Sequence, residues 1–194
     1  MLVTFHGDAP FLAHPRDLII LQAKALEIEH RFIHIKAPFM ESYRTSIMNL
    51  SSEGIQGIFT GDILDVCSSF LDRVVEGTPV ELLRPLYFLP RKEVIDLLLP
   101  FQFDIVITCC SLTQMSLEYG MELAGKRLNK EFFDKLVKDE KLDSCGENGE
   151  YHSMVLDAPL FKKRIEVKEV GPRVSDGGKF IFYDMKDYRL VEKN

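Results

Sequence analysis

Residues 103–110 read Phe-Asp-Ile-Val-Ile-Thr-Cys-Cys, an apolar run rich in β-branched side chains. A run of this kind, without polar alternation, is typical of a strand that is buried on both faces. Upstream of it, further short apolar runs alternate with segments of helical spacing. Because such alternation is typical of parallel sheets, the sequence predicts an α/β fold with helices on both faces of a parallel sheet.

The expected elements of this N-terminal half follow from its periodicity. Strands are predicted at residues 1–5, 30–35, 55–64 and 80–87. Helices are predicted at 15–30, 42–50, from about 64 to 76, and 91–99. Together with the run at 103–110, they give one continuous β/α series.

After Cys110 the character of the sequence changes. A charged segment at 120–143 has helical spacing, and a polar loop with two glycines follows at 144–154. Residues 155–171 and 179–191 are expected to form strands of a mixed or antiparallel sheet. We therefore expect two domains, residues 1–110 and a smaller α+β domain at 111–194, which pack together because no Pro- or Ser-rich linker separates them.

Composition narrows the class of protein. The 194 residues are 46% hydrophobic and 28% charged, which is ordinary for a globular protein. A net charge of −6 argues against a general nucleic-acid or membrane-surface binder. No apolar stretch approaches ~18 residues and no signal pattern is present, so a cytoplasmic location is expected. The cysteines at 67, 109, 110 and 145 form no disulfide framework or zinc motif.

The segment 145–153 carries the densest candidate chemistry. It places Glu147 and Glu150 beside two glycines, an amide, a phenol and an imidazole. Glycines let a ligand approach the backbone closely, and carboxylates can bind an amine or act as acid and base. The alternative is a solvated turn, which the same letters would also suit. Composition alone leaves both interpretations open.

A second candidate lies at Gly61 and Asp62, where a predicted parallel strand ends. Ligands of open α/β sheets bind outside the carboxyl ends of strands, so Asp62 is placed for a ribose, a metal or a substrate amine. The alternative is that Asp62 caps the following helix. His6 follows the first strand and is a weaker candidate. His30 and His34 share a strand face, but without two further ligands they predict no metal site.

Several motifs resemble one family. The stretch CGENGEYHSMVLDAPLFKKRIEV (145–167) closely resembles the signature of the diphthine–ammonia ligase family of ATP pyrophosphatases, in which a GE-x-GE-[YF] loop leads into a V-x-D-x-P-x-F strand. IFTGDIL (58–64) resembles the strand of that family that ends in Gly-Asp. LAGKRLNKEFFDKL (123–136) resembles its L-x-G-R-x-L segment, with Lys126 in place of arginine. The segment 6–28 looks like its histidine-bearing loop and Q-A-x-A-L helix, so the resemblance runs over nearly the whole chain.

The resemblance implies a fold and a reaction. It implies a HUP-like nucleotide-binding domain at 1–110 and a substrate domain at 111–194 that carries the GENGEY loop. In the family reaction, ATP adenylates the diphthine carboxylate on translation elongation factor two, and ammonia then displaces AMP to give diphthamide. The implied partners are that factor and ammonia, with no nucleic acid or membrane, and the implied cofactor is ATP with Mg²⁺.

Residue by residue, the resemblance implies two groups of site residues. The first is the loop, with Glu147 and Glu150 as catalytic residues and four neighbours that bind substrate: Asn148, Gly149, Tyr151 and His152. The second is the cofactor-binding group of Gly61, Asp62 and His6; no residue is assigned to a metal. The loop from Glu147 to His152 is expected to face the cleft at the carboxyl ends of the strands, within reach of Asp62.

The sequence departs from the family at two places. The family opens with a strand and an S-G-G-K-D-S loop that holds pyrophosphate, whereas this sequence opens at what resembles the second strand. We therefore expect residues 1–194 alone to bind adenosine or AMP weakly at best and not to turn over ATP. Asn148 stands where many ligases of the family have glycine. Two alternatives remain: a related ATP pyrophosphatase that acts on a small molecule, or a non-catalytic relative that binds a nucleotide or a protein.

Overall fold

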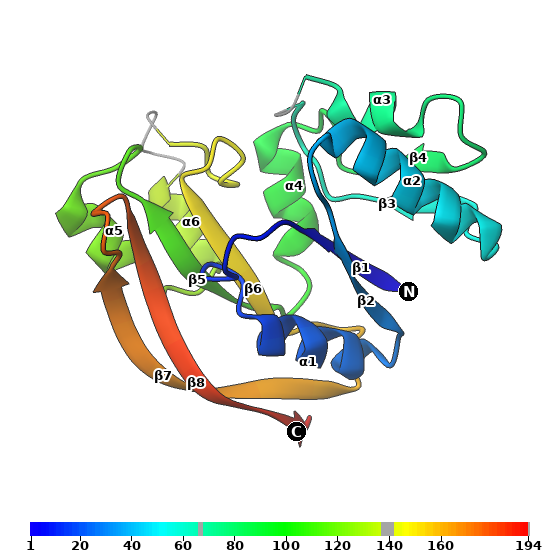
Figure 1. The fold of residues 1–194 in the computed structure, drawn as a ribbon. Coiled ribbons are helices and arrows are strands. Elements are labelled where there is room, and N and C mark those ends of the chain that lie inside the picture. The colour runs from blue at the N-terminus through cyan, green and yellow to red at the C-terminus, as the bar shows by residue number, and fades with distance from the viewer. Residues whose placement is uncertain (66–67, 137–141, 194) are drawn as a thin grey trace. The chain divides into compact units, whose positions relative to one another are not determined.

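A computed structural model describes residues 1–65, 68–136 and 142–193 of the chain. It contains two compact units, which we describe separately (Figure 1). The sheet unit comprises Met1–Leu2, Pro10–His30 and Arg91–Asn194. The parallel-pair unit comprises Val3–Ala9 and Arg31–Pro90. The chain therefore crosses from one unit to the other several times.

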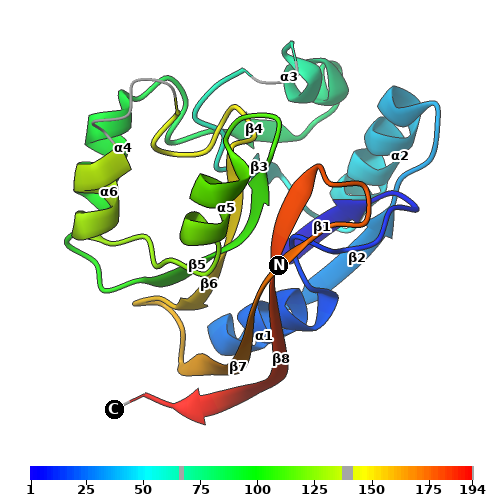
Figure 2. The ribbon, with the colours of Figure 1, turned by 90° about the vertical axis from the view of Figure 1, so that its left-hand side faces the viewer.

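The sheet unit is built on four antiparallel strands in the order β6-β5-β8-β7. Their bounds are β5 Asp104–Ser111, β6 Tyr151–Asp157, β7 Lys163–Val174 and β8 Phe180–Glu192. The last two form a long hairpin, which Figure 2 shows from the side. The expected antiparallel strands of the C-terminal part are thus confirmed.

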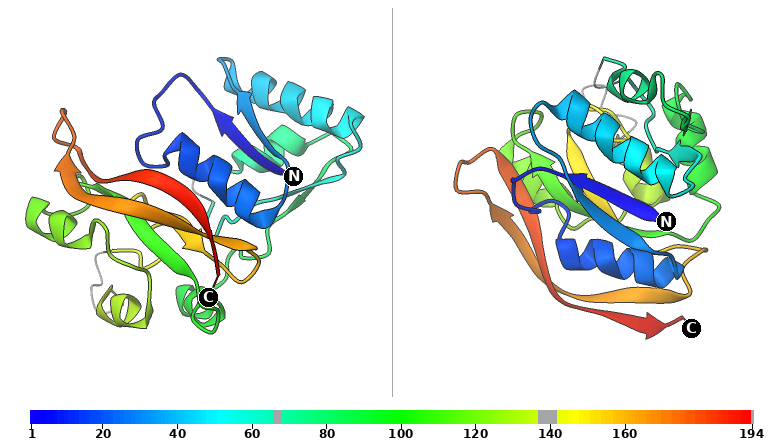
Figure 3. Two further views of the ribbon diagram at one scale, coloured as in Figure 1. Left: turned by 90° about the horizontal axis from the view of Figure 1, so that it is seen from below. Right: turned by 45° about the vertical axis from the view of Figure 1, so that its right-hand side comes forward.

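The position of β5 corrects the sequence prediction. The run at 103–110 was expected in a parallel sheet, but β5 is antiparallel to both of its neighbours. Every residue from Ile105 to Ser111 is buried. Helix α1 (Arg16–Leu26) covers one face of the sheet, and α5 (Leu117–Leu123) and α6 (Lys130–Leu136) cover the other (Figure 3). The apolar run therefore reports burial on both faces and carries no information on strand direction.

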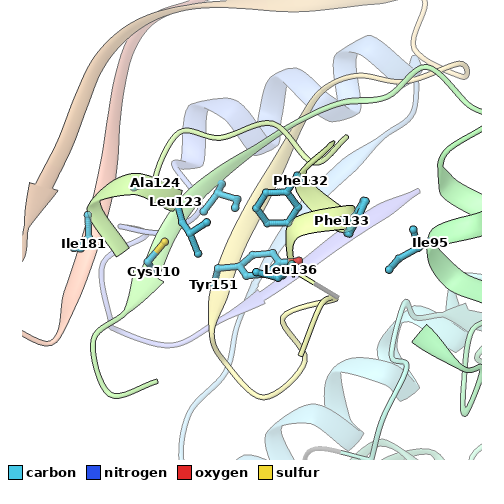
Figure 4. Close-up of a cluster of buried hydrophobic side chains, with 10 residues drawn as sticks. Ile95, Cys110, Leu123, Ala124, Phe132, Phe133, Leu136, Tyr151 and Ile181 are labelled. Carbon is cyan, nitrogen blue, oxygen red and sulfur yellow. The ribbon is translucent and has the colours of Figure 1, made fainter. Parts of the chain in front are cut away.

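A β-bulge in β5 decides which side chains enter the core. Ile107 lies opposite Ser153 and Cys109 lies opposite His152, so Thr108 is an extra residue on this strand. Because one inserted residue reverses the alternation of side chains, Ile107 and Cys110 both reach the same core cluster. Figure 4 draws this cluster and labels Ile95, Cys110, Leu123, Ala124, Phe132, Phe133, Leu136, Tyr151 and Ile181.

The opposite face of the sheet is closed by α1. Its Leu18 and Ala25 are fully buried. Gln22 Nε2 donates to Val155 O at 2.9 Å, and the backbone N–H of Lys162 donates to Ala25 O at 2.6 Å. A helix from the N-terminal part of the chain is therefore part of the C-terminal sheet's core.

The charged segment at 120–143 is not one helix. It contains the end of α5 and the whole of α6. Between these two helices, the backbone at 125–128 lies along the part of β5 that does not pair with β8. Gly125 N donates to Ile107 O, Ile107 N to Lys126 O, and Leu128 N to Ile105 O, at 2.9, 2.9 and 3.0 Å. Residues 137–141 of the predicted helical stretch lie outside the described residues.

The parallel-pair unit contains two short strand pairs. β1 (Leu2–His6) pairs with β2 (His30–His34), and β3 (Gly57–Phe59) pairs in parallel with β4 (Glu81–Leu83). In the first pair, the backbone of Leu2 bonds to Glu29 and that of His6 to Ile35, so these strands also run in the same direction. Mixed helices and strands with short parallel pairs agree with the expected α/β class, whereas a single HUP-like sheet stays a prediction.

A cluster of apolar side chains lies in the core of this unit. Ile47 of α2 (Phe39–Ser52), Val74 of α3 (Phe70–Val75) and Val80 form its buried centre. Phe5 of β1 and Ile58 of β3 pack against it.

The division of the chain differs from the expected boundary. The last crossing between the units is near Pro90, where α4 (Arg91–Leu98) begins. The assignment of 1–110 to a nucleotide and 111–194 to a substrate stays a prediction. Over the described residues, no helix is both long and apolar enough to cross a membrane.

Candidate functional site

The GENGEY loop folds around the carboxylate of Glu150. This side chain is 2% exposed, and it lies in the sheet unit directly before β6. Its Oε1 accepts the backbone N–H of Asp143 at 2.9 Å, and its Oε2 accepts that of Asn148 at 3.0 Å. Both carboxylate oxygens of Glu150 therefore hold the loop backbone, so this geometry supports a positioning role.

The glycines and Tyr151 complete this local structure. Gly146 and Gly149 have φ of 75° and 83°, which favours glycine at both positions. A Cβ on Gly146 would lie 3.1 Å from the Tyr151 ring. Tyr151 points into the core (Figure 4), and its hydroxyl donates to Ser144 O at 2.7 Å. Burial raises the pKa of Tyr151, which therefore stays protonated.

An ion pair fastens the loop to α4. Arg91 Nε and Nη2 donate to the two carboxylate oxygens of Asp143 at 2.8 and 2.6 Å. Asp143 is nearly buried and also accepts the backbone N–H of Cys145 at 2.8 Å. The hydrogen bond to Asp143 raises the pKa of Arg91. No pattern in the sequence predicts this pair, because partners separated by 52 residues leave no spacing signal.

The other residues between Glu147 and Glu150 are less buried than Glu150. Asn148 and Gly149 are exposed and Glu147 is half-buried. The two glutamates that the sequence grouped together therefore lie in different surroundings. Glu147, Asn148 and Gly149 form the part of the loop that a ligand can reach, and the substrate and catalytic roles of the loop stay predictions.

A pair of imidazoles lies at the start of β6. The ring centroids of His14 and His152 are 5.0 Å apart with an edge-to-face angle of 75°. Burial lowers the pKa of His152, and burial together with the neighbouring His152 lowers the pKa of His14. Both rings are therefore mainly neutral at pH 7. The histidine-bearing loop at 6–28 was noted in the sequence, but its contact with β6 was not predicted.

Gly61 and Asp62 follow β3 in the parallel-pair unit. Thr60 Oγ1 donates to Asp62 Oδ2 at 3.0 Å, and Thr60 N donates to Leu83 O at 3.0 Å. The alternative in which Asp62 caps the next helix is wrong, because α3 begins at Phe70 with Ser69 at its N-cap position. Asp62 thus follows the carboxyl end of a parallel strand, as the predicted ligand site requires.

His6 is the last residue of β1. Its Nδ1 lies 2.9 Å from Gly7 O, and its ring centroid lies 5.1 Å from that of His34. His34 Nε2 in turn lies 2.8 Å from Asp8 Oδ1. Within 1–65, 68–136 and 142–193, no three His, Cys, Asp or Glu side chains gather as a metal-ligand cluster.

The predicted site residues thus fall into two sets. The loop residues Glu147 to His152 lie together in the sheet unit, and Gly61, Asp62 and His6 lie in the parallel-pair unit. That the loop reaches Asp62 stays a prediction.

Comparisons with known proteins identify the family. The family model of the diphthamide synthase C-terminal domain matches residues 92–191, just over half of the chain. Diphthine–ammonia ligase of Schizosaccharomyces pombe is 36% identical over 118 residues, which cover 57% of this chain and 18% of that protein. The chain thus spans less than a fifth of the length of this curated relative. The matched region contains α4, the four-stranded sheet and the loop around Glu150, and the chain belongs to the diphthamide synthase family.

Proposed function

We propose that this chain serves in the ATP-dependent amidation of diphthine on translation elongation factor two. Family membership and the S. pombe relative, whose name specifies diphthine and ammonia, support this proposal. The product is the amide diphthamide.

The proposed chemistry has two steps. The diphthine carboxylate attacks the α-phosphorus of ATP, which releases pyrophosphate and leaves an acyl adenylate. Ammonia then attacks the acyl carbon, the bond to AMP breaks, and the nitrogen loses one proton. The first step is needed because a free carboxylate is a poor acyl donor, whereas AMP is a good leaving group.

The observation that carries the proposal is the difference in burial between the two loop glutamates. Glu150 is buried and holds the backbone of Asp143 and Asn148. This leaves Glu147 as the loop carboxylate that a ligand can reach. We assign Glu147 to bind ammonia and to accept the one proton that its nitrogen loses on attack, with Asn148 and His152 beside the acceptor group. Fixing these groups before the substrate arrives lowers the entropic part of the barrier.

The parallel-pair unit is proposed to take the nucleotide as a HUP-like domain. Asp62 follows the end of β3, where it can bind a ribose hydroxyl or help to hold Mg²⁺. Mg²⁺ in such sites takes one or two carboxylates together with the phosphates of the nucleotide, so a single carboxylate fits this ion. Mg²⁺ would supply charge neutralisation on the phosphates.

The proposal is tested by release of AMP and pyrophosphate in the presence of diphthine-bearing elongation factor and ammonium. Two proteins are compared: the 194 residues alone and the same residues preceded by the family's S-G-G-K-D-S segment. We expect turnover with the second and none with the first. In the active protein, Glu147→Gln should lower kcat at least tenfold with an unchanged Tm. Glu118→Gln, an exposed glutamate of α5, is the matched control and should keep wild-type activity.

Three outcomes would contradict the proposal. Turnover of a small carboxylic acid, but not of the elongation factor, would favour the related ATP pyrophosphatase. Absence of turnover with both proteins would favour the non-catalytic relative. Full activity of Glu147→Gln would show that this carboxylate plays no part in the amidation.

A further inference from the structure

One aromatic residue of the parallel-pair unit is both strained and exposed. Phe88 has a φ of 60° and is 66% exposed. An exposed phenylalanine alone needs no explanation, but a bulky residue at positive φ costs free energy. Burial of the ring does not offset this cost. Strain of this kind is retained where the surrounding structure fixes it, and it concentrates at ligand sites.

The surroundings of Phe88 do fix it. Its backbone N–H donates to Ile63 O at 2.9 Å, which ties it to the segment that contains Gly61 and Asp62. Its ring centroid lies 4.1 Å from that of Tyr87. The guanidinium carbon of Arg84 lies 3.8 Å from the centroid of the Tyr87 ring.

Arg84 is itself held in place. Its guanidinium pairs with Asp72 of α3, and its side chain is 15% exposed. The three residues Arg84, Tyr87 and Phe88 therefore form an ordered stack that begins at a nearly buried cation and ends at an exposed ring. Stacked cation–aromatic contacts of this kind are attractive and orient the rings.

We propose that Phe88 is the surface on which the adenine base of the nucleotide stacks. The inference rests on the proposed function and names a residue for its nucleotide. β3 and β4 are parallel, so their carboxyl ends lie at the same edge of the sheet, where ligands of such sheets bind. Asp62 follows β3. Phe88 follows β4, and its backbone N–H donates to the carbonyl of Ile63, the residue after Asp62. A planar base on Phe88 and a ribose hydroxyl on Asp62 are the contacts that a nucleoside needs.

The experiment compares two probes by saturation-transfer NMR with the 194-residue protein. AMP carries the base, and ribose 5-phosphate has the same sugar phosphate without it. Phe88→Ala should weaken AMP binding about tenfold or more, because the base loses the aromatic ring on which it stacks. Binding of ribose 5-phosphate should stay unchanged, and Phe88→Trp should restore AMP binding. Phe39→Ala removes another exposed ring of the same unit and should bind AMP like the wild type.

A third variant separates strain from folding defects. Glycine adopts positive φ without strain, so Phe88→Gly should have a Tm at least as high as Phe88→Ala, yet bind AMP equally weakly. Equal AMP affinity of the wild type and Phe88→Ala would overturn the inference and leave the proposed function standing. A parallel loss of ribose 5-phosphate binding would also overturn it. Absence of AMP binding by the wild type would overturn both the inference and the nucleotide role of this unit.

Discussion

The sheet unit and the parallel-pair unit bury their strands to very different extents. The four strands of the first have 7–13 residues, and β5 is covered on both faces. β3 and β4 of the second have three residues each, and one cluster of buried side chains in that unit consists of Ile47, Val74 and Val80. Since buried apolar surface is the main source of stability, the GENGEY loop stands on the more stable unit. Asp62 and Phe88 stand on the unit that we expect to open more readily, as ligand-binding regions often do.

The largest effect is expected at Gly125, which lies beside β5. Its φ is 85°, and a Cβ there would lie 2.3 Å from the Tyr183 ring. Gly125→Ala combines backbone strain with overpacking, so we expect a loss of about 3 kcal/mol in the free energy of unfolding. Urea unfolding measures it. Gly178→Ala, a turn glycine at φ 64° with open space around it, is the control and should lose less.

The second effect separates the two glutamates of the loop. Glu150→Ala leaves the N–H groups of Asp143 and Asn148 without their acceptor, which should cost about 2 kcal/mol. Glu147→Ala, at a half-buried position of the same loop, should cost less, because this side chain is less buried than that of Glu150. Equal losses in urea unfolding would mean that the buried carboxylate does not organise the loop.

These two positions show what the sequence could and could not predict. The spacing of Gly146, Glu147, Gly149 and Glu150 identified the loop, because chemistry and turn geometry both depend on neighbouring residues. The same letters could not tell which glutamate is buried. That depends on β6, which begins at the residue after Glu150, and on the ion pair between Arg91 and Asp143.

The same limit applies to the fold. Most helix and strand positions followed from local periodicity, but their bounds differ, the charged segment breaks after α5, and the single strand expected at 155–171 is divided between β6 and β7. The direction of β5 did not follow, because a doubly covered antiparallel strand and a parallel strand have the same apolar pattern. Parallel pairing was recovered only for the short strands β1 to β4.

A matched pair of smaller substitutions tests whether the units differ in stability. Ile47→Val and Ile107→Val each remove one methylene from a side chain that is at most 1% exposed, and each should cost about 1 kcal/mol. The residues at which amide hydrogen exchange becomes faster should then differ between the two variants. Ile47→Val should speed exchange in β3 and β4 and leave β5 protected, whereas Ile107→Val should speed exchange in β5. Identical exchange patterns would mean that the two units unfold together.

The smallest effect is the pH dependence of the His14–His152 pair. Folding lowers the pKa of both imidazoles below the ordinary value near 6.5. The unfolded chain therefore takes up more protons as the pH falls below about 6.5, and stability decreases there. His152→Phe should flatten the change in the urea midpoint between pH 7.5 and 5.5. It should also raise the pKa of His14, which NMR titration measures.

Asn148→Ala is the control for this titration, because it leaves both imidazoles in place. It should keep the wild-type dependence on pH. A wild-type slope in His152→Phe would instead assign the pH dependence to other groups.

The position of α1 in the sequence affects how the chain folds during its synthesis on the ribosome. Helix α1 is synthesised well before β7 and β8, the strands that it packs against. Its apolar face, with Leu18, Ile19 and Ala25, has no permanent cover until those two strands have been made. Pairings so distant along the chain form slowly, and exposed apolar helices attract other chains in the meantime. Nascent chains of this protein should therefore depend on a chaperone that shields residues 16–26 until β7 and β8 have been synthesised.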